Sequence, residues 1–145
     1  MKKKSVEYTL KAEKKEFPIE KMNSSEKAYE YAKKFYFDDI EIYESVFVIL
    51  VNRALNTIGH AKISQGGVSS SIVDARIVAK YAIESLCSGV ILVHNHPSGN
   101  VRPSTEDNEM TKNIERCLSV FGISLLDHLI ITNEHYYSYK DEGRL

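Results

Sequence analysis

The chain lacks several features that would assign it to a familiar class of protein. It has 145 residues and only two cysteines, Cys87 and Cys117, which are far apart and form no Cys-x-x-Cys pair. Two isolated thiols exclude a disulfide framework of the secreted type, and we expect both as buried free thiols on helices. The longest apolar run, from Val46 to Val51, is far too short to span a bilayer, and no apolar segment follows the basic N terminus as in a signal peptide. These absences predict a cytoplasmic protein with no membrane segment.

The chain also lacks an excess of charge of either sign. Lys and Arg number 19 and Asp and Glu number 20, so the formal net charge is −1. Proteins that bind duplex DNA tightly gain affinity by neutralising several phosphates with basic side chains. The composition therefore indicates no general attraction to nucleic acid. The length fits one domain of ordinary size that can bury a core of its own.

Hydrophobic patterns predict an α/β domain built on a mixed sheet, because predicted helices alternate with predicted strands. The predicted strands are 44–52, 57–64, 90–93, 125–132 and 136–139, and the predicted helices are about 24–37, 74–87 and 105–121. A weak alternation over residues 5–12 predicts an additional edge strand. Gly89 and Gly122 follow the second and third helices, where glycine commonly ends a helix.

The segment from His94 to Asp107 is the most informative part of the chain. In an extended segment, residues i and i+2 point to the same side, so His94 and His96 can present two imidazoles to one metal ion. We expect Ser104 as a helix N-cap, which places Asp107 in the first helical turn, where its carboxylate can return as a third ligand. Two nitrogens, one carboxylate oxygen and a vacant fourth position form the ligand set of a catalytic zinc site.

Simpler roles for the same residues stay open at this stage. A polar turn would account for one histidine, but less well for two at i and i+2 with an aspartate at a helix start. The Ser104-x-x-Asp107 pattern is also a variant of the capping box, and a carboxylate has two oxygens, so a cap and a ligand can coexist. A zinc site that activates water also needs a general base, and spacing alone does not distinguish among four glutamates, Glu41, Glu44, Glu84 and Glu106.

The order of these residues resembles a known signature. Glu44 before an apolar strand, then His94-x-His96-Pro97 and Ser104-x-x-Asp107, resembles the JAMM motif of the JAB/MPN metalloprotease superfamily. The flanks are similar to the RadC family, which is named for DNA repair; they include Ile63-Ser64, Arg76, Thr111 and Leu126-Asp127-His128. The resemblance covers about residues 40–141. We therefore predict a RadC-like JAB/MPN domain at 40–145, with a strand and helix extension at 1–39 in which no helix-hairpin-helix of the RadC type is found.

The resemblance implies a JAB/MPN fold, related to the cytidine-deaminase architecture, and zinc-dependent hydrolysis of an amide or isopeptide bond. It implies that His94, His96 and Asp107 bind Zn²⁺. It further implies Glu44 as the general acid and base, and Ser104 as the hydroxyl that stabilises the oxyanion. The implied partner is a protein or peptide substrate that the sequence does not identify. Nucleic acid enters only through the family association, and the sequence indicates no oligomeric state.

Other functions are weighed against this one. A DNA-repair or nucleic-acid-processing protein is the first alternative, but the consecutive letters His94-Asn95-His96 are not the dispersed motif of HNH endonucleases. A deaminase would need His-x-Glu and Pro-Cys-x-x-Cys, and neither is present. A non-catalytic interaction module on the MPN fold is disfavoured because every ligand position is filled. Structural roles are expected for the remaining histidines, His60, His128 and His135.

Overall fold

The computed structural model describes residues 2, 4–9, 17–36, 38–66 and 73–145. In chain order its elements are α1 (Ser25–Lys33), the 3-10 helix η1 (Asp38–Glu41), β1 (Ser45–Val51), β2 (Thr57–Gln65), α2 (Ala75–Ser85), β3 (Gly89–Asn95), α3 (Thr105–Ser119), β4 (Ser124–Ile131) and β5 (Tyr136–Ser138). The described strands form one sheet in the order β2-β1-β3-β4-β5. Only β3 and β4 pair in parallel, so the predicted α/β class with a mixed sheet is confirmed.

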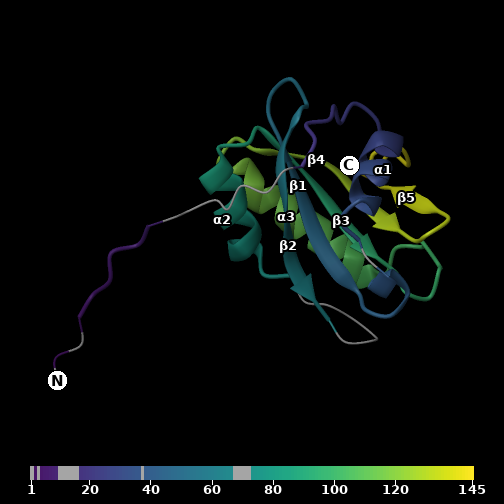
Figure 1. Cartoon of the computed structure of the whole chain (residues 1–145), viewed down its shortest axis with the longest axis horizontal. Helices are drawn as coiled ribbons and strands as arrows, with labels where there is room; N and C mark the ends of the chain where they lie inside the picture. Colours follow the sequence, from purple (N-terminus) through teal and green to yellow (C-terminus); the bar gives the residue numbers. More distant parts are fainter. Residues whose placement is uncertain (1, 3, 10–16, 37, 67–72) are drawn as a thin grey trace.

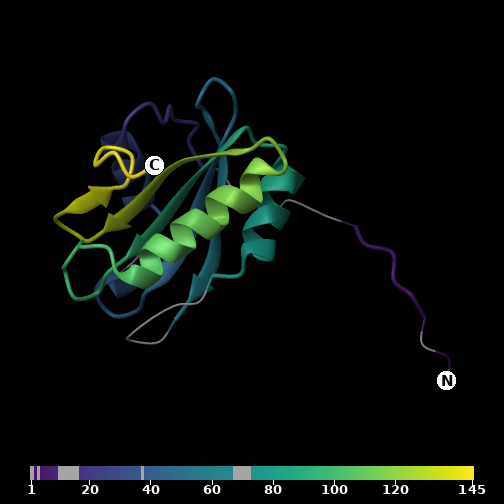
Figure 2. The same cartoon turned by 180° about the vertical axis from the view of Figure 1, so that it is seen from behind.

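Helices cover both faces of the sheet. Figure 2 shows α3 lying diagonally across one face with α2 beside it, and Figure 1 shows α1 on the opposite face. Side chains alternate along β1, so those of Phe47, Ile49 and Val51 pack on the α1 face while Val46, Val48 and Leu50 pack on the face of α2 and α3. Because both faces of β1 and β3 are buried, these strands are almost continuously apolar in sequence.

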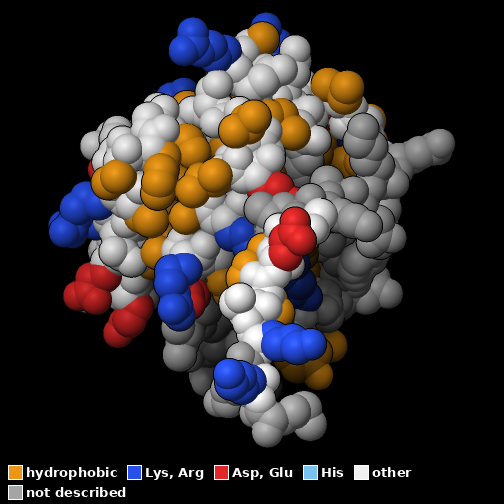
Figure 3. Space-filling model, turned by 90° about the vertical axis from the view of Figure 1, so that its left-hand side faces the viewer, with side chains coloured by type: hydrophobic (Ala, Val, Ile, Leu, Met, Phe, Trp, Pro, Cys, Tyr) orange, Lys and Arg blue, Asp and Glu red, His pale blue; other side chains and the backbone are white. Residues whose placement is uncertain are grey.

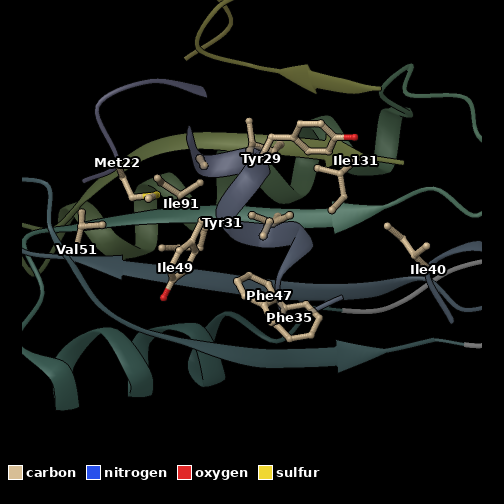
Figure 4. Packing of buried hydrophobic residues seen from close by; sticks show 14 residues of the cluster. Met22, Tyr29, Tyr31, Phe35, Ile40, Phe47, Ile49, Val51, Ile91 and Ile131 are labelled. Atoms are coloured by element: carbon tan, nitrogen blue, oxygen red, sulfur yellow. The ribbon is translucent and has the colours of Figure 1, made fainter. Parts of the chain in front are cut away.

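The first helix belongs to the same hydrophobic core as the central strands. The Ser24 side chain caps α1 by accepting a hydrogen bond from the amide of Lys27. Tyr31 on α1 and Phe35 just after it pack with strand residues such as Ile49, as Figure 4 shows. The helix within the predicted 1–39 extension is therefore packed against the sheet that carries the candidate site. The domain boundary after residue 39 stays a prediction.

The described residues depart from two expectations, the edge strand over residues 5–12 and the helix end at Gly89. Residues 5–9 are exposed and lie in no strand, whereas residues 10–12 of the expected edge strand lie outside the described residues. Gly89 does not end α2, because the helix stops at Ser85 and Leu86 adopts the left-handed conformation with φ of 52°. Gly89 instead begins β3, where a Cβ atom would lie 2.5 Å from Leu126 Cδ1. Close packing between β3 and β4, and not helix termination, explains this glycine.

One of the two cysteines expected as buried thiols is buried, and the other is only partly buried. Cys87 is buried as expected but follows α2, whereas Cys117 lies on α3.

Figure 3 shows hydrophobic side chains gathered on the side of the molecule where α2 lies, and exposed apolar residues on or just after this helix are Ile77, Ile83 and Leu86. In the described ranges, every helix is too short or too polar to cross a membrane.

Candidate metal centre

The C-terminal end of β3 brings three candidate side chains together. His94 is completely buried in β3, and alternation places His96 on the same side of the sheet, the one that α3 covers. Strand β1 runs antiparallel to β3, with Val46 opposite His94. Glu44 lies two residues before Val46, so it points to the same face at the same end of the sheet. This long-range pairing selects Glu44 among the glutamates that spacing alone could not separate.

The N terminus of α3 supplies the fourth side chain. Ser104 Oγ accepts a hydrogen bond from the amide of Asp107 at 3.0 Å, and Asp107 Oδ2 accepts one from the amide of Ser104 at 2.8 Å. These two bonds form the capping box. The same carboxylate also faces both imidazoles, since Oδ1 lies 3.1 Å from His94 Nε2 and Oδ2 lies 3.1 Å from His96 Nε2. The cap and the contacts of a ligand therefore coexist in Asp107.

Four side chains thus converge on one point. The ligand atoms offered by Glu44, His94, His96 and Asp107 all lie within 4.8 Å of one another. The two histidine Nε2 atoms are 3.0 Å apart, and Glu44 Oε1 lies 3.8 Å from His94 Nε2. Within the described ranges, this is the only group of three or more His, Cys, Asp or Glu residues that could hold a metal ion. The alternative glutamates, Glu41, Glu84 and Glu106, lie outside it.

A chain of hydrogen bonds behind the group determines which nitrogen of His94 faces the other ligands. The Thr111 hydroxyl donates to the backbone carbonyl of Asp107 at 2.8 Å, so it accepts from His128 Nδ1 at 2.6 Å. Neutral His128 then has an unprotonated Nε2, which accepts a hydrogen bond from the Nδ1–H of His94 at 2.7 Å. His94 Nε2 is left without a proton and faces Asp107 and His96 as a ligand atom.

His96 is fixed in the same tautomer by a different partner. Its Nδ1 donates to the backbone carbonyl of Asn100 at 2.6 Å, which leaves Nε2 bare. Two bare nitrogens 3.0 Å apart and a carboxylate 3.1 Å from each repel one another unless a cation or a proton lies among them. In tetrahedral zinc sites with ligands about 2.0–2.1 Å from the ion, neighbouring ligand atoms are roughly 3.3 Å apart. The donor set and its spacing therefore fit zinc.

Burial and charge act in opposite directions on the ionisable groups. Burial alone would raise the pKa of the Asp107 carboxyl. When a proton lies among these groups, hydrogen bonds from the His94 and His96 imidazoles and from the Ser104 amide outweigh burial and hold this pKa below its usual range, so the carboxylate stays ionised. Burial likewise lowers the pKa of His96, yet Asp107 and the Asn100 carbonyl outweigh it and the net shift is upward. Complete burial lowers the pKa of His128 well below its usual value. His128 is therefore neutral, as the hydrogen-bond chain requires.

Sequence reasoning did not identify the residues that support the ligands. It gave His128 a structural place near a strand end and gave Thr111 no role. His128 belongs to the site because β4 pairs in parallel with β3 and sets His128 opposite Leu92, on the same face as His94. Thr111 belongs to it because it lies on α3, where its hydroxyl bonds the Asp107 carbonyl and His128 Nδ1. The one signal in the sequence was that Thr111 and Asp127-His128 lie in the RadC-like flanks.

Comparison with known proteins agrees with this geometry. The sequence model of the family described as RadC-like JAB domain matches residues 22–144. The UPF0758 protein of Flavobacterium johnsoniae is 43% identical over 101 residues, which cover 70% of this chain and 44% of the relative. The UPF0758 protein of Thermotoga maritima is 39% identical over 126 residues, covering 87% and 55%, and that of Porphyromonas gingivalis is 41% identical over 103 residues, covering 70% and 45%. The chain spans about half the length of the curated relatives it matches.

Proposed function

The chain belongs to the RadC-like JAB domain family, and from this premise we propose that it is a zinc-dependent hydrolase of peptide or isopeptide bonds. The RadC resemblance and the JAB fold are confirmed; the activity and the metal are the proposal. One observation carries it. The bare Nε2 atoms of His94 and His96 converge with the ionised Asp107 carboxylate, while the Glu44 carboxylate lies beside them. Three ligands with a free position and an adjacent base are what metal-assisted hydrolysis requires.

Glu44 is the proposed general acid and base. A zinc ion bound by His94, His96 and Asp107 would lower the pKa of its bound water toward about 7 and polarise a substrate carbonyl. Glu44 Oε1 lies 3.8 Å from His94 Nε2, which places the carboxylate beside the ligands without making it one of the three. It would take one proton from the attacking water and later deliver it to the leaving amine nitrogen. Water is thereby added across the C–N bond, with the hydroxyl on carbon and the proton on nitrogen.

Ser104 is the proposed donor to the carbonyl oxygen of the substrate. The side chain is exposed, and its Oγ accepts the hydrogen bond from the Asp107 amide. A hydroxyl has one proton to donate and two lone pairs, so capping leaves the proton free. Within the described ranges, no acceptor takes that proton. It is therefore available to the carbonyl oxygen as negative charge develops there, and such a donor typically contributes about 3–4 kcal/mol to lowering the barrier.

The proposed substrate is a protein or peptide that meets this site from the cytoplasm. Two free cysteines in a chain of this length suit a reducing compartment. Nucleic acid is a weaker candidate, because a net charge of −1 offers no general attraction to phosphate. A purely non-catalytic module is also disfavoured, since such a module would not need Glu44 and three ligands in place.

The proposal is tested with zinc-loaded protein and a screen of peptide and isopeptide substrates. We expect the parent to cleave at least one substrate, and the Glu44→Gln variant to keep its zinc but lose turnover. Glu41→Gln is the matched control, because Glu41 bonds the Asn133 side chain outside the group. Turnover that survives in Glu44→Gln would remove Glu44 from the role of base. A zinc-loaded parent that cleaves no member of the screen would count against the hydrolase.

A further inference from the structure

We propose that Asn95, the residue between the two candidate histidine ligands, is a positioning residue that holds Glu44 against the metal site. The inference rests on the proposed function, because it takes Glu44 as the group that carries the proton. Asn95 is completely buried, and alternation along β3 turns its side chain away from His94 and His96 toward the opposite face of the sheet. It is therefore no ligand, and its burial needs another explanation.

The side-chain amide of Asn95 binds the backbone on both sides of Glu44. Its Oδ1 accepts a hydrogen bond from the amide of Ser45 at 2.8 Å. Its Nδ2 donates to the carbonyl of Tyr43 at 2.8 Å and to the carbonyl of Ile40 at 2.6 Å. The reverse orientation of the amide would place NH2 against an N–H group and oxygen against two carbonyls, so the orientation is fixed by these partners.

These bonds act where strand β3 no longer pairs with the chain before Val46. The pairing of β1 with β3 ends at Val46 opposite His94, so the backbone from 40 to 45 has no strand partner on that side. The Asn95 side chain takes the place of the next pair. On the other edge, the amide of Gly66 donates to the carbonyl of Glu44 at 2.8 Å. The segment that carries Glu44 is thus fixed from both sides, and Asn95 is its attachment to the strand that carries the ligands.

The side chains of the His94-Asn95-His96 segment therefore have two roles, one on each face of the sheet. The imidazoles point to the α3 face and offer ligand atoms, while the amide points to the α1 face and sets where Glu44 enters the site. A change at Asn95 removes no ligand atom, because His94 and His96 are held by His128 and by the Asn100 carbonyl. It should displace the Glu44 carboxylate and leave metal binding in place.

The test compares Asn95→Ala and Asn95→Asp with Glu44→Gln in the full chain loaded with cobalt(II), whose visible spectrum reports ionisation at the metal. Asn95→Asp keeps the acceptor for Ser45 and loses both donors. Asn52→Ala is the matched control, because Asn52 Oδ1 also accepts two backbone hydrogen bonds, from Ala54 and Asn56, but in the β1–β2 turn. Metal content is measured for every variant.

We expect both Asn95 variants to bind as much metal as the parent. The pH midpoint of their cobalt spectra should shift in the same direction as that of Glu44→Gln. Adding Asn95→Ala to Glu44→Gln should give no further shift, because the two residues act as one unit. Asn52→Ala should keep the parent midpoint. A merely structural role for Asn95 would not reproduce the spectroscopic signature of Glu44→Gln.

Other results overturn the inference. It fails if the Asn95 variants titrate like the parent, or if Glu44→Gln itself leaves the midpoint unchanged. The inference also fails if neither Asn95 variant folds, because Asn95 would then be needed for the stability of the whole domain. A parent that binds neither cobalt nor zinc refutes the proposed function instead. The placement of Glu44 is then tested by amide hydrogen exchange of Glu44 and Ser45 without metal, which must be faster in Asn95→Ala than in Asn52→Ala; equal rates would reject it.

Discussion

His94 Nδ1 lies 2.7 Å from His128 Nε2, and both imidazole rings are completely buried. The ring of Tyr139 stacks on that of His128, with ring centroids 4.7 Å apart and an angle of 11° between the planes. A buried group that accepts a hydrogen bond from a ligand imidazole fixes the tautomer and the orientation of that ligand. The candidate metal centre therefore depends on side chains from β4 and α3 that do not themselves touch the ligand position.

Thr111→Val should weaken zinc binding although Thr111 is not a ligand. Valine keeps the shape but cannot accept a hydrogen bond from the Nδ1–H of His128, so the chain of hydrogen bonds that leaves His94 Nε2 unprotonated is broken. Loss of such a supporting group typically costs about 10–100-fold in metal affinity. Competition with a chelator of known affinity measures the change. Thr57→Val is the control, because the Thr57 hydroxyl accepts from the amide of Glu20 away from the site; equal affinity in the two variants would contradict the role of the chain.

Local sequence patterns were sufficient to bring three of the four residues of the candidate metal group together, and insufficient for Glu44 and for the residues around the group. His94 and His96 followed from strand alternation, and Asp107 followed from the cap at Ser104, because both rules act within a few residues. Glu44 joins the site through the antiparallel pairing of β1 with β3, which sets Val46 opposite His94, 48 residues later in the chain, so no local sequence pattern indicates it. The same holds for His128, which reaches His94 through the β3–β4 register.

The misassigned glycine has a comparable cause. Gly89 follows a helix in the sequence, so the pattern favoured a role in ending that helix. What requires glycine at this position is the side chain of Leu126 on β4, which leaves no room for a Cβ atom. Sequence spacing predicts structure where neighbours in the chain decide the conformation, and it fails where a neighbour in space decides it.

Ser104 should have two separable effects. Ser104→Ala removes the N-cap of α3, which typically costs about 1 kcal/mol of stability, and it also removes the proposed donor to the substrate carbonyl. Ser104→Thr keeps a hydroxyl for both tasks. We expect both variants to keep zinc, with turnover lowered about 10²–10³-fold in Ser104→Ala and largely restored in Ser104→Thr. Unfolding curves and rates on a substrate found in the screen measure the two effects; an unchanged rate in Ser104→Ala would exclude the donor role.

Gly89→Ala should destabilise the fold, because the new Cβ would lie 2.5 Å from Leu126 Cδ1 and 3.2 Å from Val51 Cγ2. Overpacking of this kind costs roughly 1–3 kcal/mol, at the lower end if the Leu126 side chain can move. Gly59→Ala in β2 is the matched control, since no atom lies within 4 Å of its added Cβ. Thermal or denaturant unfolding compares the two. Equal stability would show that the β3–β4 contact has room that the structure does not indicate.

The number of metal ions bound per chain is what separates a metal centre from a purely structural cluster. We expect about one zinc ion per chain in gently purified parent protein, and its loss in His94→Ala and Asp107→Ala. His135→Ala should keep the metal, because His135 is an exposed histidine outside the group. Elemental analysis of the folded proteins measures all four. A parent without zinc, a parent that holds iron in its place, or zinc retained by both ligand variants would contradict the account.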